Sequence, residues 1–97
     1  MANAKKAYPY TPVLLYNIAC DIAEMYKAKI TEDKMDRFSF ITEIYGLKTK
    51  YLFLIDKQPE GCMVSVESEG DDEQAEKQIL FMLSIVDNML TTLGGSG

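Results

Sequence analysis

The spacing of the apolar residues changes twice along this chain of 97 residues, and that change constrains the fold more than any other feature. Apolar residues recur at helical spacing in residues 10–30, alternate with polar residues in residues 38–68, and return to helical spacing in residues 75–93. Helical spacing predicts an amphipathic helix, whereas alternation predicts a strand with one buried face. The pattern therefore predicts a helix at each end of the domain, with strands between them.

The ends of the two helices carry recognisable signals. Thr11-Pro12 supplies a hydroxyl that can cap free backbone N–H groups, followed by a proline at the first helical position. Asp71 to Gln74 matches a capping box at the start of the second helix. Gly94 follows the last apolar residue and is typical of a helix C-terminus.

The middle of the chain divides into three alternating segments, at residues 38–45, 48–56 and 62–68. Gly46 and the sequence Pro59-Glu60-Gly61 are turn signals between them. Such short connections predict an antiparallel meander in which the second strand is central. We expect an α+β fold of order α-β-β-β-α, a three-stranded antiparallel sheet flanked by an N-terminal and a C-terminal helix.

The length of the chain suits one domain, which can bury a core without metal or disulfide. We expect residues 1–9 to form a flexible N-terminal segment, residues 10–93 to form the single domain, and residues 94–97 to be a flexible, linker-like tail. We read Thr31-Glu32-Asp33-Lys34 as a polar connection.

The chain holds more apolar side chains than one face of such a sheet can bury. One predicted face carries Phe38, Phe40, Tyr51, Phe53, Ile55, Val64 and Val66. The other retains Ile41, Tyr45, Leu52, Leu54 and Met63, and Leu80 and Phe81 fall on the polar side of the second helix. Large exposed apolar patches usually mark partner surfaces. The alternative is a three-layer arrangement, with one helix on each sheet face, which would bury the surplus.

The net charge of −5 is unevenly distributed, because residues 58–97 carry eight acidic residues and one lysine. Six of these acidic residues form a predicted acidic patch: Glu67, Glu69, Asp71, Asp72, Glu73 and Glu76. This charge disfavours nucleic acids and anionic membranes as partners, since both select for Lys and Arg. The simpler interpretation is a solvated loop and an acidic first helical turn.

The residue types needed for common catalytic or metal sites are missing or unsuitably spaced. The chain has no His, and therefore lacks the usual base near neutral pH. Cys20 and Cys62 lie 42 positions apart in apolar segments, which favours buried free thiols in a reducing cytoplasm. The acidic segment lacks the spacing of a calcium-binding loop. We therefore predict no catalytic residue, no cofactor and no metal site.

These features favour a non-enzymatic protein-interaction module, such as an adaptor, chaperone or regulator, and we expect it to be a cytoplasmic homodimer. The predicted partner-binding residues are Tyr45, Leu52, Leu54, Met63, Leu80 and Phe81. Two alternatives remain open. One is an acidic inhibitor or decoy that occupies a basic site on a nucleic-acid-binding protein or an enzyme. The other is a small-ligand-binding domain, which needs converging polar groups in a concave site.

Overall fold

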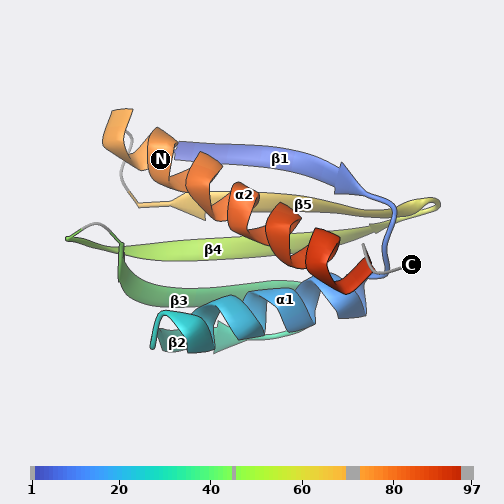
Figure 1. Ribbon diagram of the computed structural model, residues 1–97, viewed down its shortest axis with the longest axis horizontal. Helices are drawn as coiled ribbons and strands as arrows, with labels where there is room; N and C mark the ends of the chain where they lie inside the picture. Colours follow the sequence, from blue (N-terminus) through green and yellow to red (C-terminus); the bar gives the residue numbers. More distant parts are fainter. Residues whose placement is uncertain (1, 45, 70–72, 95–97) are drawn as a thin grey trace.

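The computed structural model describes residues 2–44, 46–69 and 73–94, which form five strands and two helices. In chain order these are β1 (Ala2–Tyr8), α1 (Pro12–Met25), β2 (Lys29–Asp33), β3 (Arg37–Ile44), β4 (Leu47–Gln58), β5 (Gly61–Ser68) and α2 (Glu73–Gly94). The strands form one antiparallel sheet in the order β1-β5-β4-β3-β2, and both helices lie in front of it in Figure 1. The fold is α+β with two layers.

The prediction of a three-stranded sheet is wrong, because the sheet has five strands. The three middle strands, β3, β4 and β5, lie where the alternating segments predicted strands. The two additional strands, β1 and β2, are the two edges of the sheet. β1 lies in the predicted flexible N-terminal segment, whereas β2 combines Lys29 and Ile30 from the end of the predicted first helix with residues 31–33 of the predicted polar connection.

Both edge strands are held mainly by backbone hydrogen bonds, which explains why their side chains carry so little strand signal. In β1 only Ala2 and Tyr8 are buried, and Lys5 and Lys6 are exposed. No residue of β2 is buried, and its register shifts between Ile30 and Glu32. Edge strands are commonly short, charged or bulged, because these features discourage pairing with other chains.

The first helix begins as its sequence predicts but ends earlier than its apolar pattern. The Thr11 hydroxyl accepts a hydrogen bond from the backbone N–H of Leu14, and Pro12 is the first helical residue. The helix ends at Met25, and Lys27 then adopts a positive φ of 52°. Ile30, which continued the apolar pattern, belongs to β2. The capping box at Asp71 lies outside the described residues, and α2 begins at Glu73.

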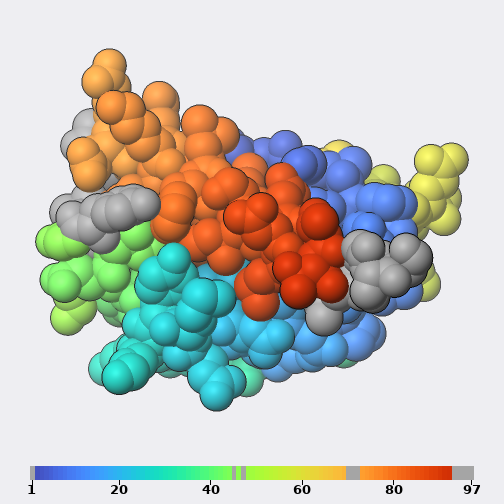
Figure 2. Space-filling view, in the orientation of Figure 1, coloured from blue at the N-terminus to red at the C-terminus, as the bar shows by residue number. Residues whose placement is uncertain are grey.

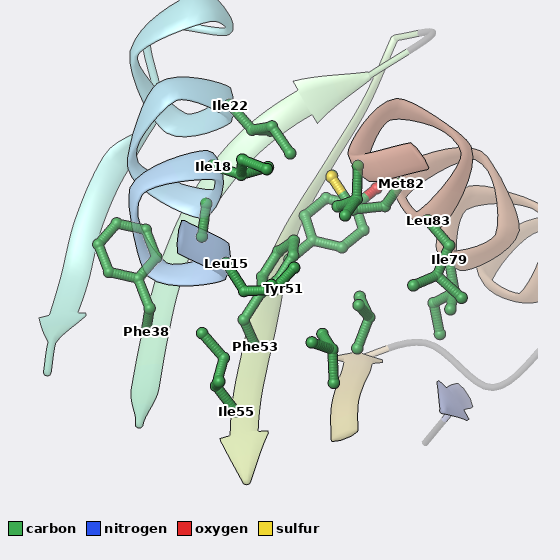
Figure 3. Packing of buried hydrophobic residues seen from close by; sticks show 14 of the residues in the cluster. Leu15, Ile18, Ile22, Phe38, Tyr51, Phe53, Ile55, Ile79, Met82 and Leu83 are labelled. Atoms are coloured by element: carbon green, nitrogen blue, oxygen red, sulfur yellow. The ribbon is translucent and has the colours of Figure 1, made fainter. Parts of the chain in front are cut away.

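The core lies between the sheet and the two helices. Figure 3 shows Leu15, Ile18 and Ile22 of α1 and Ile79, Met82 and Leu83 of α2 directed toward Phe38, Tyr51, Phe53 and Ile55 of the sheet. All of these side chains are buried. Figure 2 shows α1 and α2 covering this side of the molecule. The described residues therefore do not form a three-layer arrangement, since neither helix covers the other face of the sheet.

Polar contacts fix α2 to the sheet at two places. The buried Gln78 side chain donates a hydrogen bond to the carbonyl oxygen of Ile44 (3.2 Å) and accepts one from the Tyr51 hydroxyl (3.2 Å). At the β1 edge of the sheet, Asp87 accepts hydrogen bonds from Tyr8 (2.9 Å) and Lys6 (2.7 Å). These contacts attach the edge strand β1 to the helix layer.

Candidate functional site

The sheet has one covered face and one face without a covering element among the described residues. Residues paired across antiparallel strands point to the same side, and alternate residues along a strand point to opposite sides. Phe53 of β4 points toward the helices and is 1% exposed, whereas its neighbours Leu52 and Leu54 point away and are half-buried. We call the side that carries Leu52 and Leu54 the open face.

Four apolar side chains form a continuous diagonal across the middle of the open face. They are Ile41 of β3, Leu52 and Leu54 of β4, and Met63 of β5, and together we call them the open-face stripe. The register pairs Ile41 with Lys50, two residues along β4 from Leu52, and pairs Met63 with Asp56, two residues along β4 from Leu54. Diagonal neighbours of this kind lie about 7–8 Å apart, within reach of long side chains. All four residues are half-buried.

Small polar residues lie beside the two leucines of the stripe. Ser39 is paired with Leu52, and Ser65 is paired with Leu54. Both serines are buried. The Ser39 hydroxyl shares a hydrogen bond of 2.7 Å with the Thr31 hydroxyl, so its polar atom is satisfied within the chain. Each leucine is therefore flanked by a short serine on one neighbouring strand and by the charged side chain of Arg37 or Glu67 on the other.

Charged side chains of both signs surround the stripe. The register places Lys5, Arg37 and Lys50 on the open face with Glu32, Asp56 and Glu67. Arg37 Nε donates a hydrogen bond to Glu32 Oε1 at 2.7 Å, which confirms that β3 and β2 direct these two side chains to the same side. The open face therefore combines an apolar centre with a mixed charged rim, a composition typical of protein interfaces.

The structure brings only part of the predicted partner surface together. Leu52, Leu54 and Met63 share the open face. Leu80 is 62% exposed on α2, in the layer on the other side of the sheet, and Phe81 packs partly against the core from the same helix. Tyr45 lies outside the described residues.

The predicted acidic patch is spread over different parts of the fold. Glu67 lies on the open face, and Glu69 follows β5. Glu73 and Glu76 occupy the first turn of α2, where carboxylates favour the positive end of the helix dipole. Asp71 and Asp72 lie outside the described residues. The described residues contain no group of His, Cys, Asp and Glu side chains that could hold a metal ion.

The environments of both cysteines raise the pKa of their thiols. Cys62 is buried and Cys20 is half-buried, and both are free. Burial raises the pKa of Cys62. Burial also raises the pKa of Cys20, although a hydrogen bond with Tyr16 partly opposes this effect. Because the thiolate is the reactive form, a raised pKa lowers the reactivity of each cysteine near neutral pH.

The tyrosines of the covered face and its edges are similarly stabilised as neutral groups. Burial, followed by the hydrogen bond to Asp87, raises the pKa of Tyr8. Burial raises the pKa of Tyr51 to about 12, with a smaller contribution from Tyr26. For Tyr16 the largest cause is its hydrogen bond to Asp33, which also raises its pKa. The sequence alone did not reveal Asp87 and Asp33 as partners, because they lie 79 and 17 positions away from Tyr8 and Tyr16 in the chain.

The depressions in the described surface are open to solvent, and one of about 570 Å³ is lined mostly by the polar side chains of Lys27, Lys29, Thr42, Glu43 and Lys48. One of about 430 Å³ lies where the end of β1 meets the turn between β4 and β5 and is lined by Tyr8, Pro9, Gln58 and Glu60. Gly61 in this turn has a φ of 148°, and a side chain there would collide with the Tyr8 carbonyl oxygen. This depression is thus a consequence of the close approach of two backbone segments.

No protein-family model matches the chain, and no curated protein is similar to it in sequence. Among the described residues, neither helix is long and apolar enough to cross a membrane. The open face is therefore the candidate site on its geometry and composition alone.

Proposed function

We propose that this chain is a non-enzymatic protein-interaction module that binds a protein partner through the open face of its sheet. Its role would be that of an adaptor, chaperone or regulator. The observation that supports the proposal is the placement of α1 and α2 on one side of the sheet, which leaves Ile41, Leu52, Leu54 and Met63 facing outward. An apolar patch with a charged rim favours a protein over a nucleic acid or an anionic membrane.

We infer a cytoplasmic location from the cysteines. Cys20 and Cys62 are both free, and a reducing compartment keeps such thiols in that form.

The proposal is tested by replacing the two central leucines. The double variant Leu52→Gln/Leu54→Gln changes only outward-facing side chains, so the fold should persist, as checked by circular dichroism and urea unfolding. The control is Leu80→Gln, which alters a leucine that is 62% exposed on the helix side. Self-association is measured by sedimentation at micromolar concentrations, and apolar surface by the fluorescence of an apolar dye.

We expect the wild-type chain either to sediment above its monomer mass or to bind the dye as a monomer. Whichever signal is present should be lost in Leu52→Gln/Leu54→Gln and retained in Leu80→Gln. A strictly monomeric wild-type chain that binds no dye would contradict the proposal. An equal response of the two variants would contradict it as well, because the signal would then not come from the open face.

A further inference from the structure

The charges on the open face are arranged around the stripe with a regularity that the sequence does not display. Neighbouring strands lie about 4.8 Å apart, and alternate residues lie about 6.7 Å apart along a strand, so the register gives each outward-facing residue a position on a flat lattice. Arg37 and Glu67 lie on opposite sides of the stripe near its middle. Lys50 and Glu32 lie on opposite sides near its Ile41 end.

The same opposition holds at the other end of the stripe. Lys5 and Asp56 lie on opposite sides of it near Met63. The whole pattern has an approximate half-turn symmetry about a line perpendicular to the sheet, midway between Leu52 and Leu54. The half-turn exchanges uncharged residues of the same kind: Leu52 with Leu54, Ile41 with Met63, and Ser39 with Ser65. It exchanges these six charges with charges of opposite sign: Lys50 with Asp56, Arg37 with Glu67, and Lys5 with Glu32.

Two identical faces can be stacked with stripe on stripe in two ways that keep a two-fold axis. In the lengthwise arrangement the two-fold axis runs along the stripe. Each side chain then faces a residue of the other copy that lies at the same distance along the stripe but on its opposite side. In the crosswise arrangement the two-fold axis runs across the stripe. Each side chain then faces a residue of the other copy that lies on the same side of the stripe but toward its opposite end. Both superpose the two stripes, and only the charges distinguish them.

The charges favour the lengthwise arrangement. There each basic residue faces an acidic residue of the other copy: Arg37 faces Glu67, Lys50 faces Glu32, and Lys5 faces Asp56. In the crosswise arrangement like charges meet: Arg37 faces Arg37, Lys5 faces Lys50, and Glu32 faces Asp56. Like charges brought together at an interface oppose binding and exclude wrong orientations. Beyond the Ile41 end, Lys29 faces Lys48 in the lengthwise arrangement, which opposes it, but the three kinds of opposite-charge contact outnumber this one like-charge contact.

We infer that the open face binds a second copy of this chain in the lengthwise arrangement; this inference rests on the proposed function and names its partner. The contact is isologous, the usual form of a two-fold dimer, because one surface meets itself. The stripe provides the affinity by removing apolar area from water. The rim pairs contribute less, since exposed ion pairs are weak, and they fix the orientation instead.

The size of the face agrees with this role. The sheet extends across the molecule in Figure 1. The two largest principal-axis extents of the molecule are 36 and 24 Å. These extents set an upper limit on the area of the open face, and that limit is comparable with the ~800 Å² that each partner buries in a standard interface. Ser39 and Ser65 are buried beside the leucines, so on those two sides no long side chain separates the stacked sheets.

The inference is tested with two complementary charge variants. In Lys5→Glu/Arg37→Glu both basic positions become acidic, so four like-charge contacts form across the lengthwise dimer. In Asp56→Lys/Glu67→Lys the acidic positions become basic, with the same consequence. We expect each variant alone to self-associate at least about tenfold more weakly than the wild-type chain. An equimolar mixture should recover dimers, because every altered residue then faces an opposite charge.

The control for net charge is Lys57→Glu/Lys77→Glu, which changes the charge as much as the first variant does. Lys57 pairs with Cys62 and so points to the covered side, and Lys77 is exposed on α2. We expect this variant to dimerise like the wild-type chain. Arg37→Glu also removes the ion pair to Glu32 within the chain, so urea unfolding of each variant checks the fold. Recovery in the mixture is itself evidence that both variants are folded.

The outcomes separate this inference from the proposed function. A wild-type chain that remains monomeric at several hundred micromolar but binds apolar dye through the stripe overturns the inference and leaves the proposed function standing. Self-association that neither variant weakens, or that the mixture does not restore, overturns the lengthwise arrangement. The single variant Lys5→Glu distinguishes the two arrangements by the direction of its effect on the dimer affinity. It should weaken a lengthwise dimer, in which residue 5 faces Asp56, whereas strengthened association would indicate a crosswise dimer, in which residue 5 faces Lys50. Weakened variants that recover when mixed support the inference.

Discussion

The two faces of the sheet are built from the same strands, yet they differ in what their side chains contact. On the covered face, Phe38, Phe40, Tyr51 and Phe53 are at most 1% exposed and pack against both helices. On the open face, the alternate positions of β3, β4 and β5 carry a short apolar stripe among serines and charges. An alternating strand distributes its residues between two environments, and the placement of the helices decides which of these is the core.

Apolar side chains on this sheet therefore have two separate uses. On the covered face they stabilise the fold, and the chain meets that need with its own helices. On the open face they are too few and too far from the helices to contribute to the same core. We therefore assign the covered face to stability and propose the open face for binding.

The largest expected effect compares adjacent residues that point to opposite faces. Phe53→Ala should lower the free energy of unfolding by about 3–5 kcal/mol, because it leaves a cavity in the core. Leu54→Ala should lower it by less than about 1 kcal/mol at concentrations where the chain is monomeric, since that side chain is half-buried. Urea unfolding measures both values. Equal losses would mean that the two faces share the work of stabilising the fold.

A smaller effect concerns the titration of a tyrosine on the covered face. Burial raises the pKa of Tyr51 to about 12 from its ordinary value of 10.0. Between these values the folded state holds the hydroxyl proton more tightly than the unfolded state, so the free energy of unfolding falls as pH rises. The slope from this residue is at most about 1.4 kcal/mol per pH unit.

The Tyr51 effect is measured by urea unfolding at several pH values from 8 to 12. The variant Tyr51→Phe should show a shallower decline above pH 10 than the wild-type chain. The variant also loses the hydrogen bond to Gln78, which lowers its free energy of unfolding at every pH. Below pH 10 its plot of unfolding free energy against pH should therefore run parallel to that of the wild-type chain. Identical slopes above pH 10 would show that Tyr51 is not protected on the covered face.

The smallest expected effect compares two buried serines, one on each face. The Ser68 hydroxyl on the covered face has no hydrogen-bond partner among the described residues, whereas the Ser39 hydroxyl on the open face is bonded to Thr31. Ser68→Ala should be neutral or slightly stabilising, and Ser39→Ala should cost about 1 kcal/mol. Thermal or urea unfolding of the two variants measures the difference. The reverse order would contradict the polar contacts described for the two faces.

The core of the fold was predictable from the sequence, whereas its edges were not. The alternation in β3, β4 and β5 marks strands because one face of each is buried by aromatic and β-branched side chains. The edge strands lack that signal: β1 buries only Ala2 and Tyr8, and β2 buries no residue. Their pairing depends on backbone hydrogen bonds to a neighbour, which a single-sequence pattern does not encode.

The candidate site was predictable to a similar extent. Alternation alone placed Leu52, Leu54 and Met63 on one side of the sheet, because it fixes the direction of each side chain along a strand. It could not separate them from Leu80 and Phe81, since the side on which α2 packs is a tertiary property. The arrangement of charges around the stripe also required the strand register. The register places Lys5, Glu67 and Arg37 on one face of the sheet, although they lie far apart in the chain.

The most direct test of the open face is the solvent accessibility of its methyl groups, measured by NMR with a soluble paramagnetic probe at several hundred micromolar protein. The inferred dimer predicts that the methyl signals of Leu52, Leu54 and Met63 are protected, whereas those of Leu80 on the helix side broaden strongly. In Lys5→Glu/Arg37→Glu the protection should disappear. If Leu52 and Leu54 in the wild-type chain broaden as much as Leu80, the open face is not occupied by a second copy of this chain.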